Sequence, residues 1–204
     1  MRPLDAAAFR PEMEMRTAMI GHNGGPSAEP GESWRRHCWT AARAELLSTL
    51  PLEVLRTRVA RAKALGLDYK TYASVRAATG HDVVAFLFSS NALRVTPLRP
   101  VLANDRAAKL QGLAGVARIG LATWHLPPSL LMAVDAGLLE RAEEAPLHLA
   151  AWGQARRRML DILGKTPSDR VILVGDMALE ADWAMAARLA RYLPADRYFG
   201  GVGR

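Results

Sequence analysis

The stretch "GHDVVAFLFSSNALRV", residues 80–95, decides how the fold of this chain is interpreted. Residues 83–88 are all apolar, so at 100° per residue their side chains would point in every direction around a helix. A helix that is apolar all round is buried, and a short apolar run is equally compatible with a buried strand. In either conformation, residues 83–88 are predicted to lie in the hydrophobic core.

The same stretch follows a short predicted helix over residues 69–79, which Asp68 can cap and which ends at Gly80. Two short helices joined at a glycine suggest a helix-turn-helix, in which the second helix presents polar side chains to base edges. The apolar residues 83–88 present none. The simplest helix-turn-helix interpretation is therefore rejected.

Positive charge is concentrated in one segment. Residues 34–80 hold nine Lys or Arg and three Asp or Glu, a net charge of +6 in a chain whose total is +7. A local positive field attracts polyanions such as DNA or RNA, although long basic side chains beside an apolar strip often simply extend to water. The candidate nucleic-acid-binding residues are eight of these nine basic residues: Arg35, Arg36, Arg56, Arg58, Arg61, Lys63, Lys70 and Arg76.

Glycine and proline divide the chain into three parts. Residues 1–33 contain a Gly- and Pro-rich stretch without periodicity and are expected to form a flexible N-terminal tail. Residues 34–95 are expected to form a basic helical module, and the prolines of "TPLRP" (residues 96–100) separate it from a helix-rich second half, residues 96–204.

Local patterns predict mostly helices. Helices are expected from Ser33, over 52–65 between Pro51 and Gly66, after Asn104, and within 127–144, 147–164 and 179–193. The best strand is 171–174 in "DRVILVGD", and 117–123, "ARIGLAT", is its expected partner. The predicted fold class is mainly α, a helical domain with a small strand element, and α+β is the alternative.

The end of the predicted strand carries the second notable pattern, Gly175-Asp176-x-x-x-Glu180. It resembles the Mg²⁺-binding fourth motif of haloacid-dehalogenase-like phosphatases. That family also requires a nucleophilic Asp-x-Asp, which this chain lacks, so the resemblance is rejected. Asp176 is expected to cap the helix that follows. A pocket that gathers Asp176, Glu180 and a histidine would instead favour an enzyme.

Several classes of chemistry are not expected. The single cysteine, Cys38, excludes an internal disulfide, and one cysteine with five scattered histidines gives no zinc-ligand spacing. The sequence contains no P-loop, G-x-G-x-x-G or G-x-S-x-G motif, so no metal, cofactor or catalytic residue is predicted. It has no secretory h-region and no apolar run of membrane-spanning length, so the expected location is cytoplasmic.

The leading functional hypothesis is a non-enzymatic protein, for example a regulator, that contacts DNA or RNA without sequence specificity through the phosphate backbone. The alternative is an adaptor that binds a protein partner through helices that carry tryptophan. An enzyme that uses Asp176 and Glu180 is the third hypothesis.

Overall fold

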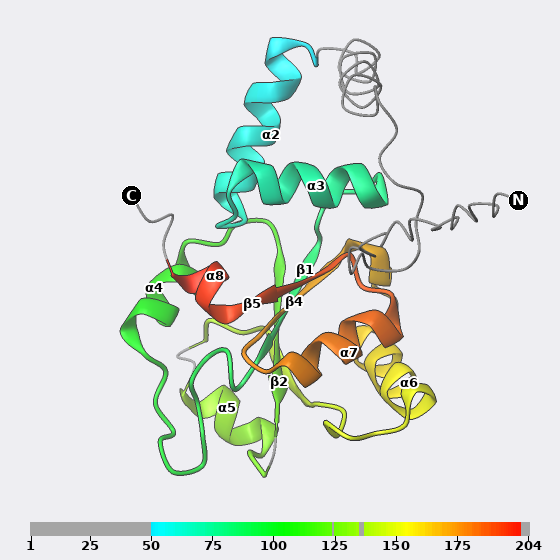
Figure 1. Ribbon diagram of the computed structural model, residues 1–204. Helices are drawn as coiled ribbons and strands as arrows, with labels where there is room; N and C mark the ends of the chain where they lie inside the picture. The colour runs from blue at the N-terminus through cyan, green and yellow to red at the C-terminus, as the bar shows by residue number, and fades with distance from the viewer. Residues whose placement is uncertain (1–49, 124, 135–136, 201–204) are drawn as a thin grey trace, which may run out of the picture. The chain divides into compact units, whose positions relative to one another are not determined.

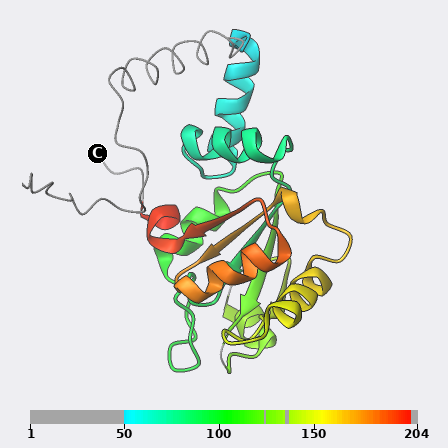
Figure 2. The same ribbon diagram turned by 45° about the vertical axis from the view of Figure 1, so that its right-hand side comes forward.

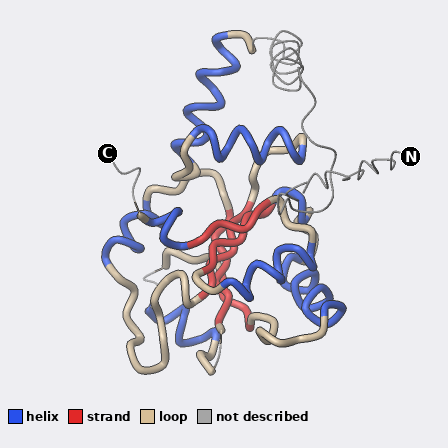
Figure 3. The backbone as a smooth tube through the Cα atoms, in the orientation of Figure 1, coloured by secondary structure: helices blue, strands red, loops and turns tan. Residues whose placement is uncertain are grey.

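Five parallel β-strands form the centre of the domain (Figures 1 and 3). The computed structural model describes residues 50–200 except 124, 135 and 136. The strands are β1 (Ala85–Ser89), β2 (Ala117–Ala122), β3 (Arg141–Glu144), β4 (Val171–Gly175) and β5 (Arg191–Pro194). Their order in the sheet is β3-β2-β1-β4-β5, and all four neighbouring pairs are parallel.

The protein is therefore an α/β protein, and the prediction of a mainly α fold is wrong. Residues 83–88 contribute to β1, the central strand of the sheet. Strands of a parallel sheet are buried on both faces, so they appear in the sequence as short continuous apolar runs without alternation. Such a run carries no periodicity that separates it from a buried helix.

Two of the segments that were expected to form long helices each contain a helix followed by a strand. The segment 127–144 contains α5 (Pro128–Val134) and then β3, and the segment 179–193 covers most of α7 (Ala178–Ala187) and part of β5. Both strands have only four residues and lie at the edges of the sheet, where burial is incomplete. Their sequences therefore lack a strong apolar signal.

Helices cover both faces of the sheet, as Figures 1 and 2 show. Side chains of β1 alternate between the faces: Phe86 and Phe88 belong to the first core cluster, and Ala85 and Leu87 to the second. The first core cluster includes side chains of α4 (Asn104–Gln111), α5 and α8 (Ala195–Phe199), and also of α2 (Leu52–Ala64) and α3 (Tyr69–Thr79), which lie above the sheet in Figure 1. The second core cluster includes side chains of α6 (Trp152–Leu163) and α7.

This arrangement is doubly wound. The chain moves from β1 outward to β2 and β3 with α4 and α5 on the first face, then crosses to β4 and β5 with α6 and α7 on the second. The direction of winding therefore reverses between β1 and β4. In open α/β sheets, ligands bind in the crevice at the carboxyl ends of the strands at this switch point.

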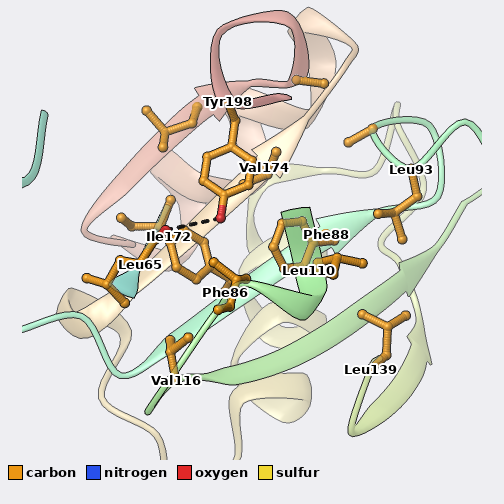
Figure 4. Close-up of a cluster of buried hydrophobic side chains, with 14 of the residues drawn as sticks. Leu65, Phe86, Phe88, Leu93, Leu110, Val116, Leu139, Ile172, Val174 and Tyr198 are labelled. Atoms are coloured by element: carbon orange, nitrogen blue, oxygen red, sulfur yellow. Dashed lines mark hydrogen bonds between the residues drawn. The ribbon is translucent and has the colours of Figure 1, made fainter. Parts of the chain in front are cut away.

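Aromatic rings fill the first core cluster (Figure 4). The ring of Phe86 lies 5.6 Å from that of Phe88 and 5.4 Å from that of Tyr198, measured between centroids. The Tyr198 hydroxyl donates a hydrogen bond to the Leu65 carbonyl oxygen at 3.2 Å, and burial raises the pKa of this phenol. This bond ties α8 to the turn after α2.

Several local predictions are confirmed. Asp68 caps α3, since its carboxylate accepts the Thr71 amide at 2.8 Å, and Gly80 ends that helix with a φ of +75°. Residues 117–122 form a strand, but its neighbours are β1 and β3, so the expected pairing with 171–174 is wrong.

The described helices include none that is long and apolar enough to cross a membrane.

The predicted tail, the predicted helix from Ser33, and the candidate residues Arg35 and Arg36 lie outside the described residues. The central sheet combines β1, which precedes the prolines of residues 96–100, with four strands that follow them.

We expect Phe86→Ala to lower the free energy of unfolding by about 3–5 kcal/mol, because it removes a fully buried ring and leaves a cavity. Chemical denaturation monitored by circular dichroism measures the change. Leu98→Ala is the control, since Leu98 is 99% exposed, and it should alter stability by less than about 0.5 kcal/mol. Equal stability of the two variants would contradict the assignment of Phe86 to the core.

Candidate ligand site at the carboxyl edge of the sheet

Polar side chains gather where the central strands end. Ser89 closes β1 and Ser90 and Asn91 follow it, Thr123 follows β2, and Glu180 lies in the first turn of α7 after β4. Three of them, Ser89, Ser90 and Glu180, have at most 1% of their surface exposed. Burial of so many polar groups is tolerated only when they are hydrogen-bonded.

The Glu180 carboxylate is the centre of this group. Its Oε2 accepts hydrogen bonds from the Ser89 hydroxyl at 3.0 Å, the Asp176 amide at 2.7 Å and the Met177 amide at 3.2 Å. Its Oε1 accepts one from the Asn91 side-chain amide at 2.8 Å. Hydrogen bonds to an ionised acceptor are among the stronger ones in proteins. Glu180 therefore joins the segment after β1 to the segment after β4.

The same carboxylate occupies the N-terminus of α7. Free amides at such a position commonly bind a phosphate or another anion. Here they point at Glu180, while the N-cap residue is Met177 and the Asp176 side chain is exposed. The expected capping role of Asp176 is therefore wrong, because Glu180 serves that purpose from within the helix.

Gly175 allows Glu180 to approach the backbone this closely. A Cβ at Gly175 would collide with Glu180 Oε2 and would lie 2.7 Å from the Tyr192 ring. The Tyr192 hydroxyl donates a hydrogen bond to the Met177 carbonyl oxygen at 2.9 Å. Burial, together with the nearby carboxylates of Glu180 and Asp176, raises the pKa of Tyr192 to about 12, so the phenol stays a donor even in alkaline solution.

A pair of hydroxyls bridges β1 and β2. Ser90 Oγ lies 2.6 Å from Thr123 Oγ1 and also accepts the Thr123 amide at 3.1 Å. Two hydroxyls carry two hydrogens, and their mutual bond uses one. Neither hydroxyl donates a hydrogen bond to any other described residue. One hydroxyl hydrogen of this pair is therefore left to donate elsewhere.

A hollow of about 440 Å³ opens beside these groups, and we call it the β1–β4 hollow. Most of its wall is apolar, and the described residues that line it include no Lys, Arg, Asp or Glu. Its lining consists of Ser90, Asn91, Val95, Thr96, Pro97, Thr123, His148, Leu149, Met177 and Leu179.

His148 lines the β1–β4 hollow and also a second hollow, of about 730 Å³, at the ends of β2 and β3. Its ring packs on Trp183 with centroids 5.0 Å apart, and its Nε2 lies 3.9 Å from Glu180 Oε1. A histidine is thus near Glu180, as the enzyme hypothesis requires, but Asp176 does not line the β1–β4 hollow. The described residues hold no cluster of three metal-ligating side chains.

The structure separates the candidate nucleic-acid-binding residues into groups. Arg61 is committed to the fold, since it binds Asp82 at 2.8 Å and donates to the carbonyl oxygens of Val83, Ala114 and Gly115. Arg56 pairs with Glu53 in the exposed part of α2, and Lys63 and Lys70 are exposed. Arg58 and Arg76 are half-buried and line one hollow with Arg61 and Tyr72.

The sequence did not single out Ser89, Ser90, Asn91 or Thr123. Their signal is a polar residue placed directly after a buried strand, as in "AFLFSSN" and "IGLAT". That signal has a meaning only once the strands are known to be parallel and adjacent.

Comparison with models of known families, with curated proteins and with solved structures finds no match to this chain.

We expect Gly175→Ala to destabilise the domain by about 1–3 kcal/mol, because the added methyl group collides with Glu180 and Tyr192. Gly153→Ala is the matched control: a Cβ there meets nothing within 4 Å, so it should stabilise the domain by about 0.4–1 kcal/mol. Thermal melts of both variants test this. A Gly175→Ala variant as stable as Gly153→Ala would show that Glu180 does not need this close approach.

Proposed function

We propose that this domain binds a small organic molecule in the β1–β4 hollow. The observation that carries the proposal is the position of the hollow, which opens at the switch point between β1 and β4 beside polar groups fixed by buried hydrogen bonds. Doubly wound α/β domains bind their ligands at this point of the sheet.

The composition of the wall supports the proposal. Ligand sites are mostly apolar, with a few polar groups that orient the molecule. Here Val95, Leu149 and Leu179 supply apolar surface, and Ser90, Asn91 and Thr123 supply hydrogen-bonding groups. The polar groups arise from the strand ends, so their positions are set by the rigid sheet.

We expect Thr96→Trp to block binding, because Thr96 is an exposed residue on the wall of the hollow and an indole there would fill it. A library of small neutral, cationic and anionic organic molecules is screened by ligand-observed NMR against both proteins. Compounds that bind the wild type should lose affinity for the variant by at least about tenfold, which corresponds to about 1.4 kcal/mol of binding free energy.

Leu98→Trp is the matched control, since it adds the same side chain to the same loop at a residue that is 99% exposed and does not line the hollow. It should leave binding unchanged. If no compound distinguishes Thr96→Trp from Leu98→Trp, the domain does not bind ligands in the β1–β4 hollow.

Nucleic-acid binding is a second candidate function, and one observation favours it. Arg58, Arg61 and Arg76 come together in the α2–α3 hollow, a depression of about 440 Å³ that Tyr72 also lines. Arg61 is already bonded, and Glu53 and Asp82 in the same hollow offset part of the positive charge. Arg58 and Arg76 form no ion pair with another described residue, so they are the two arginines of this group that we expect to contact phosphate.

We expect the double variant Arg58→Gln/Arg76→Gln to weaken binding about equally on unrelated duplexes, because phosphate contacts do not depend on base sequence. It should also flatten the plot of log K against log salt by about 0.9 for each phosphate that the protein no longer neutralises. Fluorescence anisotropy at several salt concentrations measures both effects.

Arg157→Gln/Lys165→Gln removes the same charge from exposed positions near α6 and is the control. Identical behaviour of the two double variants, or no binding by the wild type at low salt, would reject this function.

A further inference from the structure

The orientation of the Asn91 side chain is fixed by its neighbours. Its Nδ2 carries two hydrogens, of which one is donated to Glu180 Oε1 at 2.8 Å and the other to the Met177 sulfur at 3.3 Å. The oxygen and nitrogen of an asparagine amide are usually assigned from such partners. An ionised carboxylate only accepts hydrogen bonds, so the nitrogen must face Glu180. Among the described residues, Asn91 Oδ1 has no hydrogen-bond donor.

The β1–β4 hollow therefore offers two complementary groups from adjacent residues. Asn91, which lines it, has only an acceptor left, and the Ser90–Thr123 pair, which also lines it, has one hydroxyl hydrogen left. Within the described part of the chain, no Lys or Arg lines the hollow to neutralise an anion, and no carboxylate lines it to neutralise a cation. His148 also lines the hollow, but its Nε2 lies 3.9 Å from Glu180 Oε1, so a positive charge on its ring would be offset by that carboxylate. Burial of an unpaired charge is strongly unfavourable.

From these contacts we propose that the ligand is an uncharged molecule with an apolar body and an edge that carries a donor beside an acceptor, as in a carboxamide or a lactam. This inference rests on the proposed function, because it assigns the chemistry of the ligand in the same hollow. Asn91 receives the donor of that edge, and the Ser90–Thr123 pair supplies a hydrogen bond to its acceptor. The apolar body packs on Val95, Leu149 and Leu179.

Glu180 acts as a positioning residue in this site. It does not line the hollow, yet its carboxylate determines which end of the Asn91 amide is left for the ligand. It also excludes phosphate from the N-terminus of α7, because it already accepts the amides of Asp176 and Met177. The ligand therefore differs in class from the phosphate-bearing molecules that bind at helix N-termini.

Four probes of similar size test the ligand class: benzamide, benzoate, benzylamine and toluene. Each is titrated into isotope-labelled protein, and dissociation constants are taken from the amide shifts of Ser90, Asn91 and Thr123. We expect benzamide to bind about tenfold more tightly than the other three, the ratio expected when one buried group loses its partner. Benzoate or benzylamine binding as tightly as benzamide would overturn the assigned class, whereas no shift of these amides by any probe would overturn the proposed function itself.

Glu180→Gln tests the positioning role without replacing any residue that lines the hollow. The glutamine oxygen must accept the three donors now on Oε2, so its NH₂ group must face Asn91. Asn91 then has to turn its oxygen toward residue 180, which leaves its NH₂ group for the ligand. The affinity of benzoate relative to benzamide should therefore rise by about tenfold.

Asp176→Asn is the matched control, because it removes the same charge from the neighbouring exposed carboxylate and leaves Asn91 as it is. It should leave the ratio of the two affinities unchanged. A ratio that is the same in both variants would overturn the positioning role. If Glu180→Gln does not fold, Asn91→Leu takes its place: benzamide affinity should fall about tenfold while toluene affinity is retained, and equal loss of both would overturn the role of Oδ1.

Discussion

The hydrogen bonds of the buried Glu180 carboxylate hold the carboxyl edge of the sheet together. A carboxylate without exposure to water is stable only when donors replace its hydration, and four donors do so here. They come from Ser89 and Asn91 on one side and from two backbone amides after β4 on the other. Because β1 and β4 flank the switch point, this one side chain fixes the relative position of the two segments that border the hollow.

The close approach of Glu180 sets requirements on its surroundings. Residue 175 has to be a glycine, since any Cβ would displace the carboxylate, and Tyr192 has to remain protonated to donate to the Met177 carbonyl oxygen. A phenol is protonated at physiological pH, and the raised pKa of Tyr192 extends that state to more alkaline pH. The polar arrangement at the edge of the sheet therefore depends on packing as well as on hydrogen bonds.

Arg61 shows why a count of basic residues overestimates the charge available to a polyanion. Its guanidinium donates to Asp82 and to three backbone carbonyl oxygens, which attaches α2 to the segments before β1 and β2. Arg56 is likewise paired with Glu53. A positive segment in the sequence thus contains side chains that stabilise the fold alongside others that remain available to bind a ligand.

Features with local causes could be predicted from the amino-acid sequence. The Asp68 cap, the end of α3 at Gly80 and the burial of residues 83–88, all buried except the partly buried Val84, follow from neighbouring residues and from hydrophobicity. The fold class could not be predicted in this way, because a fully buried parallel strand of five residues and a buried helical turn have the same apolar composition. The pairing of β1 with β4 and the contact between Asn91 and Glu180 join residues about ninety positions apart in the sequence. These contacts are known only from the tertiary structure, because hydrogen-bond partners at strand ends are set by the order of strands in the sheet, and no residue near Asn91 in the sequence specifies that order.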